Sequence, residues 1–365
     1  MTVRVELPEN CAPAQVRAIA DRLVYSVEGI TGIEVTISPP ALSVTHDGWP
    51  DDDEVGQVVR ELADEALSAR VSEPKVVRRH EPASSRPPWP DRDGFARARP
   101  LLHRAFDALF LELARGAGAT ERQLPALIDL RVMERCRYVD LFPQNAYLVD
   151  ELAHHRPHLA RLRDGTTTVD DLRRSSPYML NPALCFHVYD EYADTALDGL
   201  SVVTAAGGCF RHEAPWRLDA FRLPSFTMRE IVFLGGKAEV EDIRNTLLDQ
   251  VWRLYLDLGL HGRVETATDP FYYVEDSAIR QHQLLAKVKY ELVGHRPGGG
   301  QSAIVSFNNV RDSLCRQFGI RDAAGRTAHS GCVAFGVDRW VELTLESFGP
   351  HPRDWPEAIG KHCPS

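Results

Sequence analysis

The segment 208–230, GCFRHEAPWRLDAFRLPSFTMRE, carries charged residues at a spacing suited to nucleotide chemistry. We expect two strands joined by a turn, and residues two apart on a strand point to the same face, which would place Arg211 beside Glu213. A guanidinium can bind a phosphate through two parallel hydrogen bonds, and a neighbouring carboxylate can accept from an amino group. The simpler alternative is an Arg/Glu ion pair across two solvent-exposed strands.

The expected returning strand has a second set of chemically useful residues. Arg222, Phe226 and Glu230 are spaced by four, so on a strand they share one face. An arginine suits a phosphate, an aromatic ring suits a flat base, and a carboxylate suits an ammonium group or a metal ion. Together with the first strand, this pattern favours a surface that activates a nucleotide.

Two further segments have features of ligand sites. Segment 329–349 reads as a glycine-bearing strand followed by Gly336-Val337-Asp338-Arg339, which opens a helix with an apolar face. Glycine allows close approach of a ligand, and an arginine at the start of a helix can meet a phosphate. Segment 128–149 predicts a helix leading into Phe142-Pro143 and then a strand.

The cysteines do not form a local framework. The seven are widely scattered and include no CxxC pair, at Cys11, Cys136, Cys185, Cys209, Cys315, Cys332 and Cys363. This spacing argues against a disulfide scaffold and against a zinc ribbon. Any metal site must therefore be assembled from distant positions.

Composition narrows the class of protein. The 365 residues are 44% hydrophobic, enough for a full core and for two domains. The formal net charge of -10 argues against general nucleic-acid binding, which rests on Lys and Arg displacing counterions. The sequence has neither a run of about 18 apolar residues nor a signal-peptide pattern at its start, so we expect a cytoplasmic protein without membrane contact.

The elements that must position these residues fall into an α+β pattern. Residues 1–78 predict a small α+β domain, and the proline-rich stretch 79–92 suits a linker. Residues 93–365 form the expected catalytic domain, which opens with a helix at 93–116. Strands there mostly neighbour hairpin signals, favouring an antiparallel sheet.

Segments 128–149, 208–230 and 329–349, in this order, resemble motifs 1, 2 and 3 of the class II aminoacyl-tRNA synthetases. Pro143 resembles the motif 1 proline, and the resemblance covers about 125–349. The spacing of Arg, Phe and Glu on the returning strand is similar to the seryl branch. The resemblance implies an antiparallel sheet flanked by helices and a homodimer built on motif 1.

The resemblance also implies roles in binding ATP with Mg²⁺. Arg211 would hold the α-phosphate, Glu213 the adenine amino group and Arg339 the γ-phosphate. Phe226 would stack on adenine, and Arg222 would be a further phosphate contact.

Relatives within the seryl branch hold a catalytic zinc with Cys, Glu and Cys, which this chain matches with Cys185, Glu230 and Cys332. We expect three adjacent strands of one sheet to deliver them. Two thiolates and one carboxylate leave zinc an open position for an α-amino group. The alternative is two buried core cysteines and an ion-paired glutamate.

Weaker candidates follow from the same resemblance. SFNNVRDSLCRQFGI at 306–320 is similar to a seryl-family stretch near ATP or substrate, making Ser306, Asn308 and Asp312 candidates. Lys287 lies where seryl enzymes have a strand that contacts the substrate. Charged residues that alternate along a strand, however, more often form its solvent-exposed face.

Three hypotheses differ in what, if anything, accepts the activated amino acid. A zinc-containing seryl-type core with only a small acidic unit before it resembles the amino acid:[carrier protein] ligases. These activate a small amino acid, of the glycine, alanine or serine class, and transfer it to the phosphopantetheine thiol of a carrier protein. The alternatives are a specialised seryl-type tRNA synthetase, although tRNA binding asks for basic contacts that the small unit lacks, and a non-catalytic paralogue.

Overall fold

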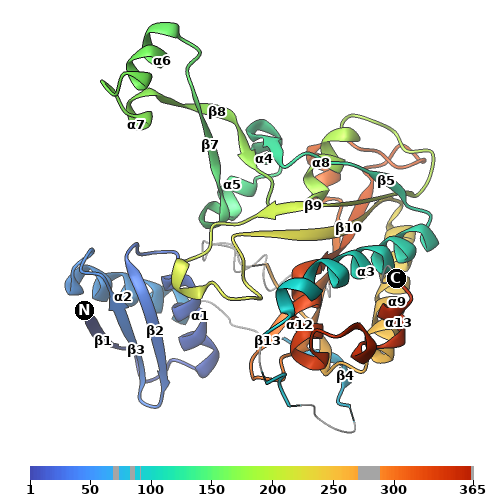
Figure 1. Cartoon of the computed structure of the whole chain (residues 1–365), viewed down its shortest axis with the longest axis horizontal. Coiled ribbons are helices and arrows are strands. Elements are labelled where there is room, and N and C mark those ends of the chain that lie inside the picture. The colour runs from blue at the N-terminus through green and yellow to red at the C-terminus, as the bar shows by residue number, and fades with distance from the viewer. Residues whose placement is uncertain (69–73, 83–86, 91, 270–287, 363–365) are drawn as a thin grey trace.

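The computed structural model describes residues 1–68, 74–82, 87–90, 92–269 and 288–362 (Figure 1). Its first part is a separate small unit with its own core, beside the rest of the chain. The three-stranded antiparallel sheet of this unit has the order β1-β3-β2 and is covered by α1 and α2. The bounds are β1 Thr2–Glu6, α1 Pro13–Leu23, β2 Ile30–Ile37, β3 Pro40–His46 and α2 Asp52–Ser68.

An eight-stranded sheet forms the centre of the larger part, in the order β4-β11-β12-β13-β14-β10-β9-β5. Only β5 pairs in parallel, with β9, and the other pairings are antiparallel. The expected α+β class with an antiparallel sheet is therefore confirmed. The strands are β4 Val76–His80, β5 Thr120–Arg122, β9 Ser201–Phe210, β10 Ser225–Gly235, β11 Gly262–Thr266, β12 Lys289–His295, β13 Gln301–Arg311 and β14 His329–Gly336.

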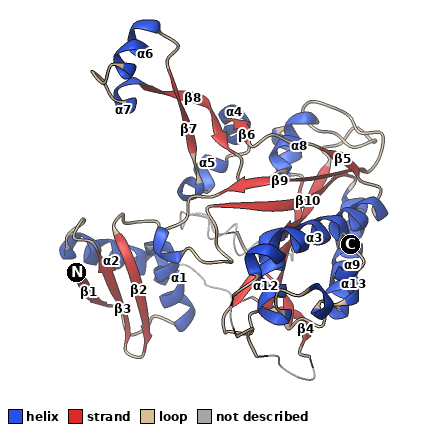
Figure 2. Ribbon diagram, viewed as in Figure 1, coloured by secondary structure: helices blue, strands red, loops and turns tan. Residues whose placement is uncertain are grey.

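The central strands bury side chains on both faces of the sheet. Phe233, Phe307 and Phe335 are fully buried on one face, in one core with three helices. Those helices are α3 Phe95–Gly116, α9 Lys237–Asp257 and α12 Val337–Phe348, and they lie against the sheet in Figure 2. On the opposite face Val232 and Leu234 are buried in a second core, and the candidate site lies on this face.

Strand β4 crosses the first expected domain boundary. Val76–His80 pairs with β11 at the edge of the eight-stranded sheet, although the sequence suggested a domain end at residue 78. Trp89, expected in the linker, packs against the large core. The division into 1–78, 79–92 and 93–365 stays a prediction, and its linker contains residues that the large core holds in place.

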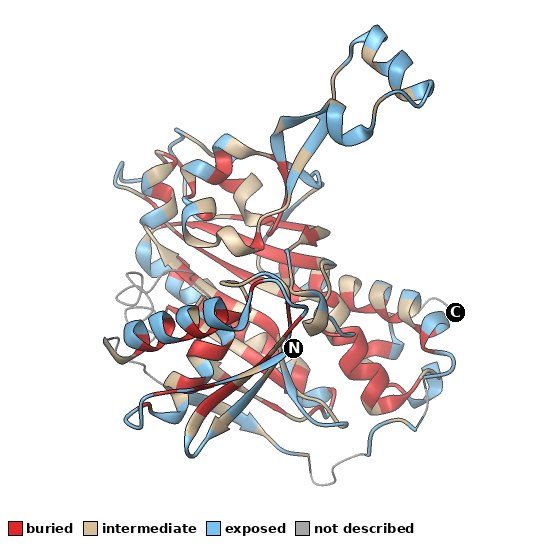
Figure 3. Cartoon of the chain, turned by 90° about the vertical axis from the view of Figure 1, so that its left-hand side faces the viewer, coloured by how far each residue is buried: buried red, intermediate tan, exposed pale blue. Residues whose placement is uncertain are grey.

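A third sheet, of order β6-β8-β7, carries an arm that projects from the body (Figure 1). The arm is largely exposed at its tip, whereas the central strands are buried (Figure 3). The elements of this region are β6 Leu127–Asp129, α4 Leu130–Arg135, α5 Tyr138–Leu141, η1 Pro143–Asn145, β7 Leu148–Leu152, α6 Arg156–Arg163, α7 Val169–Leu172 and β8 Arg173–Leu180.

Short helices complete the chain: α8 Cys185–Glu191, η2 Pro215–Arg217, α11 Ser313–Gln317, η4 Pro352–Asp354 and α13 Glu357–Gly360. In the part of the chain that the structure describes, no helix combines the length and the apolar character needed to cross a membrane.

Candidate active site

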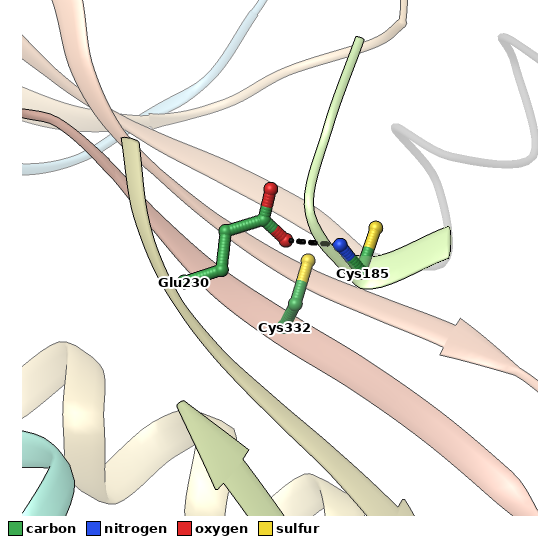
Figure 4. A group of neighbouring side chains, drawn as sticks. All are labelled: Cys185, Glu230 and Cys332. Carbon is green, nitrogen blue, oxygen red and sulfur yellow. Dashed lines mark hydrogen bonds between the residues drawn. The ribbon is translucent and has the colours of Figure 1, made fainter. Parts of the chain in front are cut away.

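Two thiols and a carboxylate meet over the central sheet (Figure 4). The ligand atoms of Cys185, Glu230 and Cys332 all lie within 4.8 Å of one another. Strand register explains why two of these residues are neighbours. Glu230 of β10 pairs with Ala334 of β14, and Cys332 is two residues from Ala334 on the same face. The group combines donors that suit a divalent metal ion.

The helix α8 delivers the third member, which corrects the expectation of three adjacent strands. Cys185 is the first residue of α8 rather than part of a strand. Strand β8 ends at Leu180, and Pro182 shortly after it has no backbone N–H to extend a ladder. The chain therefore turns, and the start of the helix brings the thiol over the sheet.

Backbone amides hold the buried carboxylate. Glu230 is 1% exposed, and its Oε1 accepts from Leu184 N at 2.9 Å while Oε2 accepts from Cys185 N at 3.1 Å. Burial nevertheless raises the pKa of Glu230, against the lowering effect of these amides. The hydrogen bonds fix the carboxylate's direction toward the two sulfur atoms.

The electrostatics of the group favour a cation. The pKa of Cys185 is raised by its hydrogen bond with Cys332, by burial and by the charge of Glu230. Burial and these neighbours thus raise the cost of ionising the Cys185 thiol, and a divalent ion would reverse that cost. Two sulfurs and one oxygen fit a four-coordinate zinc with one open position.

Asn308 joins this group from β13. Its Nδ2 donates to Ser306 Oγ at 3.0 Å and lies 3.3 Å from Cys332 Sγ. Of the weaker candidates, Ser306 and Asn308 therefore lie at the site. Asp312 instead forms an ion pair with Arg316, and Lys287 lies outside the described residues.

Three arginines gather beside the group. Arg211 lies with its guanidinium 5.3 Å from the Phe226 ring centroid and donates to Pro182 O at 3.3 Å. Arg339 donates to Phe221 O and to Ala303 O, both at 2.7 Å. Burial, followed by the positive charges of Arg211 and Arg222, lowers the pKa of Arg339 to about 10. An anion such as a phosphate would relieve this repulsion.

Arg211 connects the arginines to the metal-ligand group. Its guanidinium lies against Phe226, which shares a face of β10 with Glu230, and it donates to Pro182 O, three residues before Cys185. Its charge also lowers the pKa of Glu230 and that of Arg339. Arg211 therefore lies beside the metal-ligand group.

The segment with the Arg-x-Glu pair differs from the expected hairpin. β9 ends at Phe210 and β10 starts at Ser225, so Arg211, Glu213 and Arg222 all lie in the connection. Prolines in this connection remove ladder donors, although Arg211 N still donates to Pro224 O at 3.0 Å. Glu213 accepts from Arg222 Nη1 at 2.8 Å. This ion pair, rather than a shared strand face, keeps Glu213 and Arg222 together.

Two further residues lie at the site, one from the substrate-contacting strand that the sequence suggested and one from the small unit. Lys289 is 8% exposed, and its Nζ lies 2.6 Å from Asp269 and 3.2 Å from Glu291. Lys289 pairs with Asn308 across the sheet. Tyr25 reaches Glu213 from the small unit, a contact between residues 188 positions apart for which the sequence has no signal.

The chain has measurable similarity to known ligases. Amino acid–[acyl-carrier-protein] ligase 1 of Bradyrhizobium diazoefficiens is 33% identical over 258 residues, covering 67% of this chain and 76% of the relative. Ligase 2 of the same organism is 34% identical over 250 residues, covering 65% and 72%. The type-2 serine–tRNA ligase of Methanopyrus kandleri is 28% identical over 279 residues, 69% of this chain but 52% of that protein.

Solved structures share the fold. The M. kandleri seryl-tRNA synthetase, crystallised with A. aeolicus tRNASec, matches 99% of this chain and 77% of its own, with a TM-score of 0.70 at 22% identity. The Pyrococcus horikoshii seryl-tRNA synthetase, complexed with ATP, matches 85% and 80%, with a TM-score of 0.55 at 16% identity. No protein-family profile matches the chain.

The mostly antiparallel eight-stranded sheet and the order of its motifs define a homologue of the class II aminoacyl-tRNA synthetases. Within that class, the chain belongs to the family of amino acid–[acyl-carrier-protein] ligases and is an ATP-dependent ligase.

Proposed function

We propose that this protein activates a small amino acid with ATP and transfers it to the phosphopantetheine thiol of a carrier protein. The observation that carries the proposal is the position of Arg211, which lies against Phe226 and donates to Pro182 O, beside the Cys185/Glu230/Cys332 group. An amino acid held at that group by its amine would have its carboxylate near phosphates held by Arg211.

Cys185, Glu230 and Cys332 would hold a zinc ion, which would supply a Lewis-acidic position for the α-amino group. The amides of Leu184 and Cys185 keep the Glu230 carboxylate oriented toward the two sulfurs. Asn308, 3.3 Å from Cys332 Sγ, would fix the position of that sulfur.

The arginines would bind ATP. Arg211 would contact the α-phosphate, Arg339 the γ-phosphate and Arg222 a further phosphate oxygen, with Mg²⁺ bridging phosphates. Phe226 would stack on adenine, and Glu213 would accept from the adenine amino group. Phe226 already lies beside the Arg211 guanidinium, an arrangement that would place the base next to the α-phosphate.

Two displacements complete the reaction. The amino acid carboxylate attacks the α-phosphorus, the bond to the β-phosphate oxygen breaks, and pyrophosphate leaves with aminoacyl-adenylate formed. The carrier thiol then loses its proton and attacks the acyl carbon, forming a thioester as AMP leaves. Catalysis comes from positioning and from neutralising phosphate charge, without a protein nucleophile.

The proposal also includes a homodimer, with a symmetric contact at the motif 1 region. Large apolar side chains are exposed on the β6-β8-β7 sheet, which includes part of this region: Leu127 is 41%, Tyr178 is 43% and Leu148 is 67% exposed. Exposed apolar residues on one sheet are typical of a protein interface.

Transfer to tRNA is the second candidate, because type-2 serine–tRNA ligases are among the relatives. Charge argues against it: the basic residues of 1–68 are Arg4, Arg17, Arg22 and Arg60, against thirteen Asp and Glu. A surface of this charge repels a phosphate backbone.

An acceptor assay tests the proposal. The protein is incubated with ATP, Mg²⁺, zinc and each radiolabelled small amino acid, together with candidate carrier proteins or total tRNA. We expect hydroxylamine-labile label on a phosphopantetheinylated carrier and none on the same carrier with its attachment serine changed to alanine. Label on tRNA and not on any carrier would establish the second candidate instead.

A further inference from the structure

The small N-terminal unit contacts the connection that carries the proposed ATP ligands. Trp216 of η2 packs against the core of the unit, and Arg217 lies 3.5 Å from Asp21 of α1. Tyr25, just beyond the end of α1, donates its hydroxyl to Glu213 Oε2 at 3.0 Å. Figure 1 shows the unit beside this connection. The unit is therefore in direct contact with the Arg-x-Glu segment.

The Glu213 carboxylate is held from two sides. Its side chain is 10% exposed, and Oε2 accepts both from Tyr25 and from Arg222, which lies at 2.8 Å. Neither of these bonds uses Oε1, and among the described residues no hydrogen bond to Oε1 is found. A carboxylate fixed through one oxygen can present the other to a donor in a single direction.

A well-packed helix supports the tyrosine. Val16, Ile19 and Leu23 of α1 are at most 1% exposed in the core of the unit, and Tyr25 N donates to Arg22 O at 3.0 Å. The phenol is thus anchored to an ordered element, which makes a precise contact possible.

We infer that Tyr25 is a positioning residue for nucleotide recognition: it orients Glu213 so that Oε1 accepts from the 6-amino group of adenine. The inference rests on the proposed function, since it presupposes ATP at this site. It makes the N-terminal unit part of the nucleotide site, without any contact of its own with the substrate. The burial of the phenol and the charge of Glu213, which raise the pKa of Tyr25, keep it protonated as a donor.

The test compares ATP with purine riboside triphosphate, which has a hydrogen in place of the 6-amino group. Dissociation constants of both, with Mg²⁺, are measured by calorimetry on the full chain and on Tyr25→Phe. We expect Tyr25→Phe to weaken ATP binding about fivefold, the effect of one hydrogen bond. Binding of the analogue should change less than about twofold, because it makes no contact with Oε1.

Asp21→Asn is the matched control, since it removes an ion pair of the same interface that does not involve Glu213. Its ATP affinity should stay within about twofold of the wild type. Equal weakening of both nucleotides by Tyr25→Phe, no weakening of ATP, or an equal loss in Asp21→Asn would each overturn the inference. Failure of the wild type to bind ATP would instead overturn the proposed function, and the inference with it.

Discussion

The decisive side chains at the residue scale are the two cysteines and the glutamate of the metal-ligand group. Glu230 and Cys332 were predictable as neighbours, because motif order places their strands in one sheet and alternation places them on one face. The helical position of Cys185 was not, since a short segment with a proline fits a strand or a helix start equally well. Their role as zinc ligands stays a prediction.

Removing either thiol should empty the metal site. In Cys332→Ala and Cys185→Ala, two donors are too few for tight binding, so metal content should fall from about one ion per chain to near zero. Adenylation should fall about 100-fold or more, since even outer-shell changes cost 10–100-fold. Elemental analysis and pyrophosphate exchange measure the two effects.

Cys136→Ala is the matched control, because Cys136 is a buried core residue outside the ligand group and should keep its metal. Full adenylation by a metal-free Cys332→Ala protein would contradict the zinc assignment.

Arg339 should act through ATP alone. Replacement by alanine removes a charged donor to a phosphate, so the KM for ATP should rise about 10–100-fold, while the KM for the amino acid changes little. Arg339→Lys keeps the charge without the planar fork and should be intermediate. Arg353→Ala, on a side chain 82% exposed, serves as control. Steady-state exchange kinetics provide the comparison, and unchanged ATP kinetics would remove Arg339 from the site.

The connection between β9 and β10 is the important feature at the element scale. A turn at Asp219 orders its return: the Asp219 carboxylate accepts from Phe221 N and Arg222 N, both at 2.8 Å, and from Arg296 at 2.9 Å. Burial alone would raise the pKa of Asp219, but these donors outweigh it and lower the pKa below 3.8.

The sign of this shift predicts a pH dependence. A carboxylate with a lowered pKa in the folded state stabilises the fold above its unfolded pKa, and the contribution is lost as pH falls through the folded value. Asp219→Asn should therefore have a lower Tm than the wild type at pH 7, and the difference should shrink as pH falls below about 4. Thermal unfolding between pH 7 and pH 3 measures it. A difference that grows on acidification would contradict the assignment.

Local sequence signals predicted elements unevenly. The helix expected at 93–116 is α3, because its apolar spacing matches a buried stripe. Strand β3 begins with a proline and β4 lies next to a stretch rich in proline, a residue type that weakens the local signal of a strand. The pairing of β4 with β11 joins positions far apart in the chain, which no local pattern contains.

The whole molecule combines a synthetase-like body with a small acidic unit and an exposed arm. The fold class followed from motif order, but how the small unit sits on the body depends on surface complementarity, so Tyr25 and Glu213 could not be paired from sequence. Their contact places an acidic unit against the proposed nucleotide site.

The proposed dimer makes a prediction at this scale. Light scattering should give a mass of twice 40.9 kDa for the wild type. Leu148→Glu places a charge at an exposed apolar position of the β6-β8-β7 sheet, where a partner would bury it at high cost, so it should shift the protein toward monomer. Val169→Glu changes an exposed apolar residue in the arm, outside this sheet, and should remain dimeric. A monomeric wild type would contradict the dimer.

The most direct test of the central claim is ATP–pyrophosphate exchange on the zinc-loaded protein, screened over every small amino acid. We expect exchange that depends on one of them, or on a closely related few, and that is lost in Cys332→Ala. Absence of exchange with all of them, from a protein that is folded and holds its metal, would contradict the claim that this site forms an aminoacyl-adenylate.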